Sequence, residues 1–151
     1  MLKNSIFARL YRFIKYNRYR KLSLKALLLS AYYRVCILLI KPKKLHKRWG
    51  AEGEETSMEV DSVDAQAYKY AYGVAYAVDR VCTRTAWESK CLVRALTAQR
   101  LLKKKNIPST MYLGCKMADG KMVAHAWLRV GTLYVTGGNG EGYSVVDKFR
   151  A

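Results

Sequence analysis

The fold is decided by residues 91–130, which read CLVRALTAQRLLKKKNIPSTMYLGCKMADGKMVAHAWLRV. In the first fifteen of these residues the leucines recur at helical spacing, which predicts an amphipathic helix beginning at Cys91. Asn106-Ile107-Pro108 ends that helix, because proline disfavours helical backbone in the residue before it. Beyond the proline the period of the apolar residues changes to two, which is typical of strands.

The remaining elements follow from the same two periods. Four strands are expected, at 110–117, 122–130, 133–136 and 143–146. Upstream, the alanines of 63–82 favour a helix over the strand that its alternating tyrosines would also allow. Two more helices are expected before residue 41, the second spanning 22–40. Helices followed by an antiparallel sheet predict an α+β fold, with the cysteine-headed helix packed on the sheet.

Charge divides the chain into three parts. Residues 1–50 hold 14 of the 28 Lys and Arg and no acid, whereas 52–64 hold six of the eleven acids. This pattern predicts a basic helical region at 1–50, an acidic linker at 51–64 and a mixed core at 65–151. The net charge of +17 indicates an anionic or amphipathic partner, or at least a surface that repels other copies of itself.

Several classes of protein and site are disfavoured. The four cysteines include no CxxC pair and there are only two histidines, so we expect no metal site and no cofactor. No signal-peptide cleavage pattern follows a short apolar core, so a cytoplasmic protein with reduced thiols is expected. Lys25 and Arg34 interrupt the apolar stretch 22–40, which favours a buried or membrane-surface helix over a spanning one.

Cys91 and His125 are the candidates for chemistry. Cys91 begins its helix, where unpaired amide groups and the adjacent Lys90 favour a thiolate, and Ser89 is the expected cap. His125 lies within a strand, on the same face as Trp127. A helix-borne cysteine facing a strand-borne histidine is the nucleophile and base arrangement of thiol hydrolases. A buried cysteine beside a core histidine would give the same pattern.

Several motifs also resemble one family of enzymes. They are Trp87, Cys91-Leu92, Ala95-Leu96, Leu101-Leu102 before Asn106-Ile107-Pro108, Gly114, and Ala124-His125-Ala126-Trp127-Leu128. Together they look like the lasso-peptide leader peptidases, the transglutaminase-like cysteine proteases that form the protease half of the lasso-peptide B protein. The resemblance covers roughly residues 20–150 and implies a transglutaminase- or papain-like core.

The resemblance implies a function and partners. The family removes the leader from a ribosomally made precursor peptide, so Cys91 would be the nucleophile and His125 the general base. The implied partners are the precursor, a leader-recognition protein and an ATP-dependent macrolactam cyclase. Trp87 would offer an indole N–H near the nucleophile, although hydrophobic packing beside the cysteine explains this residue better.

The third catalytic residue departs from the family pattern. Many members place an aspartate about a dozen residues beyond the histidine, where this chain has Gly137. Asn139 is our choice, because asparagine orients imidazole in papain-like triads. Asp147 and a backbone carbonyl that orients His125 are the alternatives.

Two functions that involve no catalysis are also compatible with parts of the sequence. A basic nucleic-acid-binding module would explain the charge, but the basic residues are interleaved with an apolar stripe and no reader motif appears, so no nucleic acid is expected. A membrane-binding module would explain residues 1–48 alone. We expect the helix at 22–40 to pack on the core, and residues 1–20 to meet the leader-recognition complex or anionic lipid at the inner membrane surface.

Overall fold

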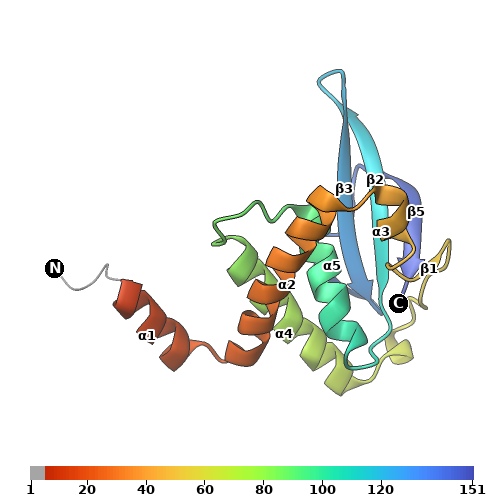
Figure 1. Cartoon of the computed structure of the whole chain (residues 1–151). Coiled ribbons are helices and arrows are strands. Elements are labelled where there is room, and N and C mark those ends of the chain that lie inside the picture. The colour runs from red at the N-terminus through yellow and green to blue at the C-terminus, as the bar shows by residue number, and fades with distance from the viewer. Residues whose placement is uncertain (1–5) are drawn as a thin grey trace.

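The computed structural model describes residues 6–151 and has the predicted α+β fold (Figure 1). The helices are α1 (Ile6–Tyr16), α2 (Arg20–Leu39), α3 (Pro42–His46), α4 (Ala65–Cys82) and α5 (Cys91–Lys103), with a 3-10 turn at Val60–Ser62. The strands are β1 (Ala51–Glu52), β2 (Thr110–Ala118), β3 (Lys121–Val130), β4 (Leu133–Thr136) and β5 (Ser144–Arg150). The sequence patterns missed α3, the 3-10 turn and β1, which are too short to show a period.

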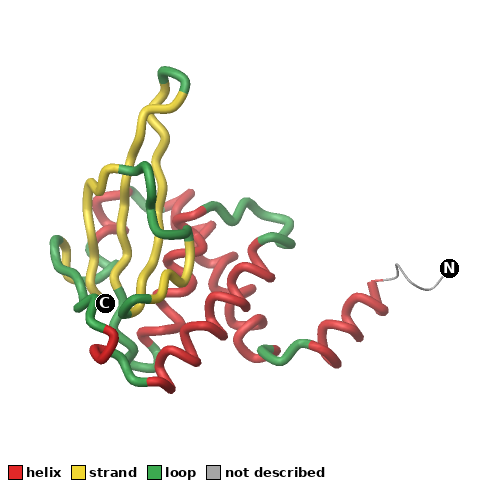
Figure 2. The backbone as a smooth tube through the Cα atoms, turned by 180° about the vertical axis from the view of Figure 1, so that it is seen from behind, coloured by secondary structure: helices red, strands yellow, loops and turns green. Residues whose placement is uncertain are grey.

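The strands form one antiparallel sheet in the order β1-β5-β2-β3-β4. Figures 1 and 2 show the helices on one face of this sheet, and Figure 2 shows the loop between β4 and β5 crossing the other. We call these the helix face and the open face. The long β2–β3 hairpin pairs Gly114 with His125, and β4 pairs with β3 only as far as Leu128.

The core lies between the helices and the sheet. Leu96 and Leu101 of α5 are buried against a cluster that includes Ala126 and Leu128 of β3 and Phe149 of β5. Burying a leucine side chain contributes about 1.5–3 kcal/mol, so this cluster accounts for the position of α5 on the sheet. The predicted inward face of α5 is confirmed at these two leucines.

Helix α4 has a defined start and a close neighbour. The carboxylate of Asp64 accepts a hydrogen bond from the amide of Ala67 at 2.7 Å, which caps the first turn. Gly73 faces α2, where an added Cβ would lie 2.8 Å from the ring of Tyr19. The alanine-rich segment is therefore the helix that its composition favours, and it packs closely enough on α2 to require glycine.

The acidic segment 51–64 carries more structure than a linker requires. Its first two residues form β1, which pairs with β5. Its carbonyls at Thr56 and Ser57 accept hydrogen bonds from the guanidinium of Arg129, at 2.8 and 3.0 Å. Arg129 is fully buried, so its five N–H groups need acceptors, and this segment supplies two. Burial of one arginine thus fixes the segment to the sheet.

Helix α2 packs on α4 and α5, as expected for the helix at 22–40. It is the one helix in residues 6–151 that is long and apolar enough to cross a membrane by length and composition. Only 22% of its most apolar window is buried within the molecule.

Candidate active site

Cys91 is the first residue of α5 and is half-buried. The residue before it, Lys90, has extended backbone and no side chain caps the helix. The amide groups of the first turn are therefore left for solvent or a ligand, and their partial positive charge favours an anion such as a thiolate. The predicted cap, Ser89, is wrong, because its hydroxyl is hydrogen-bonded to that of Thr85 at 2.9 Å.

The loop before Cys91 is held to the neighbouring helix by Arg94. Its Nε donates to the carbonyl of Ser89 at 3.0 Å, and its Nη1 donates to Asp79 of α4 at 3.1 Å. Lys90 is paired with Glu88 at 2.7 Å, so its charge acts partly on that carboxylate rather than on the thiol. The position of Cys91 is thus set by backbone and by Arg94.

His125 lies on β3 with its ring half-buried and its Nε2 2.7 Å from the carbonyl oxygen of Gly137. A carbonyl only accepts, so Nε2 carries the proton and Nδ1 of the neutral ring is the acceptor. The rings of Trp127 and Tyr143 lie against the imidazole, with centroids 5.9 and 4.9 Å away. His125 therefore has a fixed tautomer and a restricted ring.

Gly137 can offer this carbonyl only as glycine. Its φ is +76°, and an added Cβ would lie 2.4 Å from the carbonyl oxygen of Ala126. Any other residue would strain the backbone and collide with β3. The position at which the family resemblance implies an aspartate is thus occupied by a backbone acceptor for the same histidine.

The strand alternation separates His125 from the core that contains α5. Ala126 and Leu128 face the helices, so His125 and Trp127 face the open side, where Gly140 of the β4–β5 loop contacts the Trp127 ring. Within residues 6–151 no hydrogen bond joins Cys91 to His125. Because β4 pairs with β3 only as far as Leu128, His125 lies beside an unpaired edge of β3.

A small cavity lies between α4 and β4. It measures about 350 Å³ and is lined by α4, by Arg94 of α5 and by residues 134–138, including Gly137. The cavity is therefore lined by Arg94, which lies one turn after Cys91, and by Gly137, which is hydrogen-bonded to His125.

Asn139 is exposed and is used within its own loop. Its side-chain oxygen accepts a hydrogen bond from the amide of Glu141 at 3.0 Å. In this structure the group bonded to His125 is the carbonyl of Gly137, and Asn139 is not brought to the imidazole. Sequence reasoning allowed for such a carbonyl but could not place it, because a main-chain oxygen leaves no residue type to recognise. Asp147 bonds the amide of Lys148 at 2.7 Å.

The other cysteines differ from Cys91 in their surroundings. Cys36 and Cys82 are buried, at 6% exposure each, and burial raises the pKa of the Cys82 thiol. Cys115 is half-buried on β2. Among the residues that the structure describes, no three of the side chains that commonly bind metals are grouped to hold an ion.

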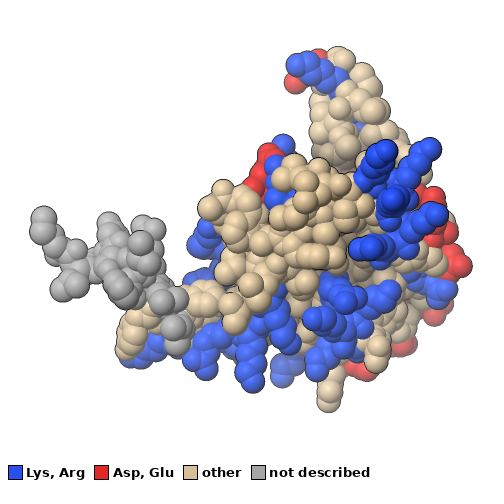
Figure 3. All heavy atoms as spheres, viewed as in Figure 1, with Lys and Arg blue, Asp and Glu red and all other residues tan. Residues whose placement is uncertain are grey.

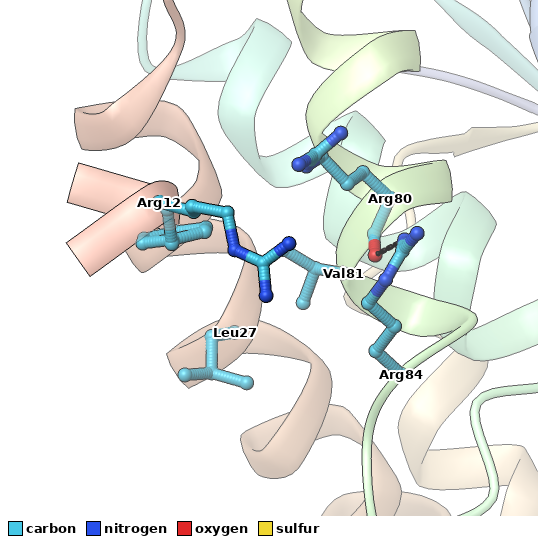
Figure 4. Close-up of a pocket in the computed structure, with 6 residues that line it drawn as sticks. Arg12, Leu27, Arg80, Val81 and Arg84 are labelled. Atoms are coloured by element: carbon cyan, nitrogen blue, oxygen red, sulfur yellow. Dashed lines mark hydrogen bonds between the residues drawn. The ribbon is translucent and has the colours of Figure 1, made fainter. Parts of the chain in front are cut away.

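A larger cavity of about 740 Å³ lies away from Cys91, between α1, α2 and α4. Figure 4 shows the guanidinium groups of Arg12, Arg80 and Arg84 around it, with Leu27 and Val81 forming its apolar wall. No acidic side chain is among the described residues that line this cavity, so it complements an anionic group.

The comparisons with known proteins identify one family. A model of the transglutaminase-like superfamily matches residues 37–148, which is more than half of the chain. No curated protein and no solved structure matches the chain.

Proposed function

The chain belongs to the transglutaminase-like superfamily, and from that premise we propose that it is a cysteine peptidase that removes the leader from a lasso-peptide precursor. The superfamily is one of cysteine proteases and acyltransferases, which supports thiol chemistry. The leader-peptidase activity is our own inference from the motifs around Cys91 and His125.

The observation that carries the proposal is the hydrogen bond from His125 Nε2 to Gly137. It leaves Nδ1 to accept the thiol proton of Cys91, after which the thiolate attacks the carbonyl carbon of the scissile bond. The C–N bond then breaks, and the imidazolium returns its proton to the leaving amine. Water hydrolyses the resulting thioester and regenerates the thiol.

This chemistry requires the imidazole to meet Cys91 at the unpaired edge of β3. The cavity lined by Arg94 and Gly137 lies between α4 and β4, and we propose that part of the peptide occupies it. In apo structures catalytic hydrogen bonds are often incomplete and form when substrate binds. We therefore propose that the bound precursor closes the gap between the thiol and Nδ1.

Two donors are suited to the developing oxyanion. The backbone N–H of Cys91 belongs to the uncapped first turn of α5. The indole N–H of Trp87, four residues earlier, is buried and has no hydrogen-bond partner among the described residues. A buried donor without an acceptor costs about 1–3 kcal/mol, which a substrate carbonyl would recover.

The proposed setting is cytoplasmic, with a leader-recognition protein presenting the precursor and an ATP-dependent cyclase closing the ring. The arginine-lined cavity supports a docking role for residues 1–20, of which residues 1–5 lie outside the described part. Arg12 comes from this segment and faces Arg80 and Arg84. Deleting residues 1–20 should slow cleavage of the full precursor and leave alkylation of Cys91 unchanged.

The deciding experiment combines the full-length protein with a precursor and a recognition protein encoded beside it, and follows leader release by mass spectrometry. Cys91→Ala and His125→Ala should each abolish cleavage, whereas the matched control Cys115→Ala should retain it. Cleavage by the folded Cys91→Ala protein would overturn the assignment. Full activity in His125→Ala would remove the histidine from the mechanism.

A further inference from the structure

We propose that α2 attaches this protein to the surface of an anionic bilayer, with the helix lying in the membrane plane. The contact surface is the leucine face, which consists of Leu24, Leu28, Val35, Leu38 and Leu39. This inference concerns the outward side of α2 and does not depend on peptidase activity.

The leucine face is a continuous exposed stripe. Its five side chains are 55%, 64%, 53%, 64% and 78% exposed, in chain order. Their spacing of 4, 7, 3 and 1 residues keeps all of them on one side of the helix at 3.6 residues per turn. At 1.5 Å per residue, the stripe from Leu24 to Leu39 extends about 22 Å along α2. Isolated exposed leucines are ordinary, but a stripe of this length indicates a contact surface.

The buried side of α2 carries small and polar side chains at positions that leucines could have filled. Ser23, Ala26 and Ser30 are completely buried against the rest of the molecule. Their small side chains let α2 approach the neighbouring helices closely, and Asn17, in the turn before α2, donates to Ser23 at 2.9 Å. A helix of a soluble domain usually does the reverse, burying leucines and exposing serines. Leu22, Leu29 and Ile37 pack partly buried against the core, whereas the five residues of the leucine face remain exposed.

Charge identifies the surface that the leucine face meets. Exposed basic residues lie at both ends of α2, namely Arg20, Lys21, Lys25, Lys41, Lys43 and Lys44. The first 50 residues hold no acid that would offset them. Figure 3 shows Lys and Arg side chains on either side of an uncharged area over α2. An apolar stripe with basic ends matches a bilayer whose anionic headgroups lie above its acyl chains.

Other occupants fit less well. A nucleic acid would meet the lysines but offers no apolar phase for the leucines. Crossing the membrane would strip α2 from α4 and α5, exposing Ser23 and Ser30 to hydrocarbon. A helix lying in the interface keeps those contacts and inserts its apolar face by about 5–10 Å. A protein partner would need an apolar groove with an acidic rim, and the experiment separates that case.

The test uses the full-length protein and flotation with two kinds of vesicle, phosphatidylcholine alone and phosphatidylcholine mixed with phosphatidylglycerol. The double variant Leu28→Asn/Leu38→Asn removes two side chains that are each 64% exposed. Its matched control is Met117→Asn/Met122→Asn, which removes two side chains that are 69% and 73% exposed and face each other on the β2–β3 hairpin. Circular dichroism verifies that both variants are folded.

We expect binding to the anionic vesicles only, weakened by added salt. The leucine variant should bind at least about tenfold more weakly, equivalent to ~1.4 kcal/mol, and the methionine control should bind as the parent does. Equal binding by parent and leucine variant would overturn the proposal. So would failure of the parent to bind, or a dimer in light scattering that the leucine variant abolishes, which would make the stripe a protein interface.

Discussion

Replacing Arg129 with methionine should destabilise the fold and impair the His125 site together. Arg129 is completely buried and makes five hydrogen bonds. Two go to the hydroxyl of Tyr112, at 3.1 and 2.9 Å, and one to the carbonyl of Gly131 at 2.6 Å. The other two hold the carbonyls of Thr56 and Ser57. Methionine fills a similar volume but supplies no donor, so these acceptors lose their partner.

The size of the effect follows from those contacts. Leaving one buried acceptor without its donor costs about 1–3 kcal/mol, and several acceptors lose Arg129, so a total loss of about 3–5 kcal/mol is expected. For a chain of this length each kcal/mol lowers Tm by about 2–4 °C, so Arg129→Met should lower Tm by about 6–20 °C. Tyr112 also stacks on Trp127, with centroids 5.5 Å apart, and Trp127 lies against His125. Turnover should therefore fall even at temperatures where the variant is folded.

The assay is thermal unfolding by circular dichroism, paired with leader-release rates well below Tm. Arg150→Met is the control, because that side chain is half exposed and pairs with Glu54 at the surface. An exposed pair contributes about 0–1 kcal/mol, so the control should unfold within a few degrees of the parent. If Arg129→Met unfolds with the control, its hydrogen bonds do not hold the 51–64 segment to the sheet.

Three further outcomes are expected. Cys91 should react with iodoacetamide faster than the other cysteines, read by mass spectrometry, and faster labelling of Cys115 would contradict its assignment as nucleophile. Asn139→Ala should leave kcat within about threefold, because Gly137 holds the histidine; a fall above about a hundredfold would restore the asparagine as its orienting group. The hydrogen bond from Tyr112 lowers the pKa of Glu55, so that carboxylate stabilises the fold above its ordinary pKa of 4.5, and the stabilisation disappears as pH falls through the lowered value. Glu55→Gln should accordingly lower Tm at pH 7 more than at pH 3, and an equal loss at both would refute the linkage.

The order and type of the long elements could be predicted from the sequence because each one shows its own period. Helix α5 begins at Cys91 as expected, and β4 has the predicted bounds. Strand β5 extends to Arg150, well beyond the predicted end at 146. The prediction stopped short because Asp147 and Lys148 do not continue the apolar alternation, although both pair with β2. Pairing with a neighbouring strand fixed this segment, and a single sequence does not show it.

The site was predictable as residue types and not as contacts. A cysteine opening a helix and a histidine within a strand are local features. The partner of His125 depends on how the β4–β5 loop returns over β3, which involves the positive φ of Gly137 and the ring of Trp127. The predicted cap of α5 was wrong for a similar reason. The hydroxyl of Ser89 is hydrogen-bonded to the hydroxyl of Thr85 and not to an amide of the helix.

The oxygen that accepts the hydrogen bond of His125 belongs to the main chain, whereas mutations change side chains. No codon change removes a carbonyl group, so what descendants of this gene must preserve is the path of a loop, secured by one glycine at position 137. In the mechanism that we propose, the shape of the backbone therefore does what an acidic side chain does in the family pattern. Surveys of genomes that require an acid at the third position would discard chains built in this way.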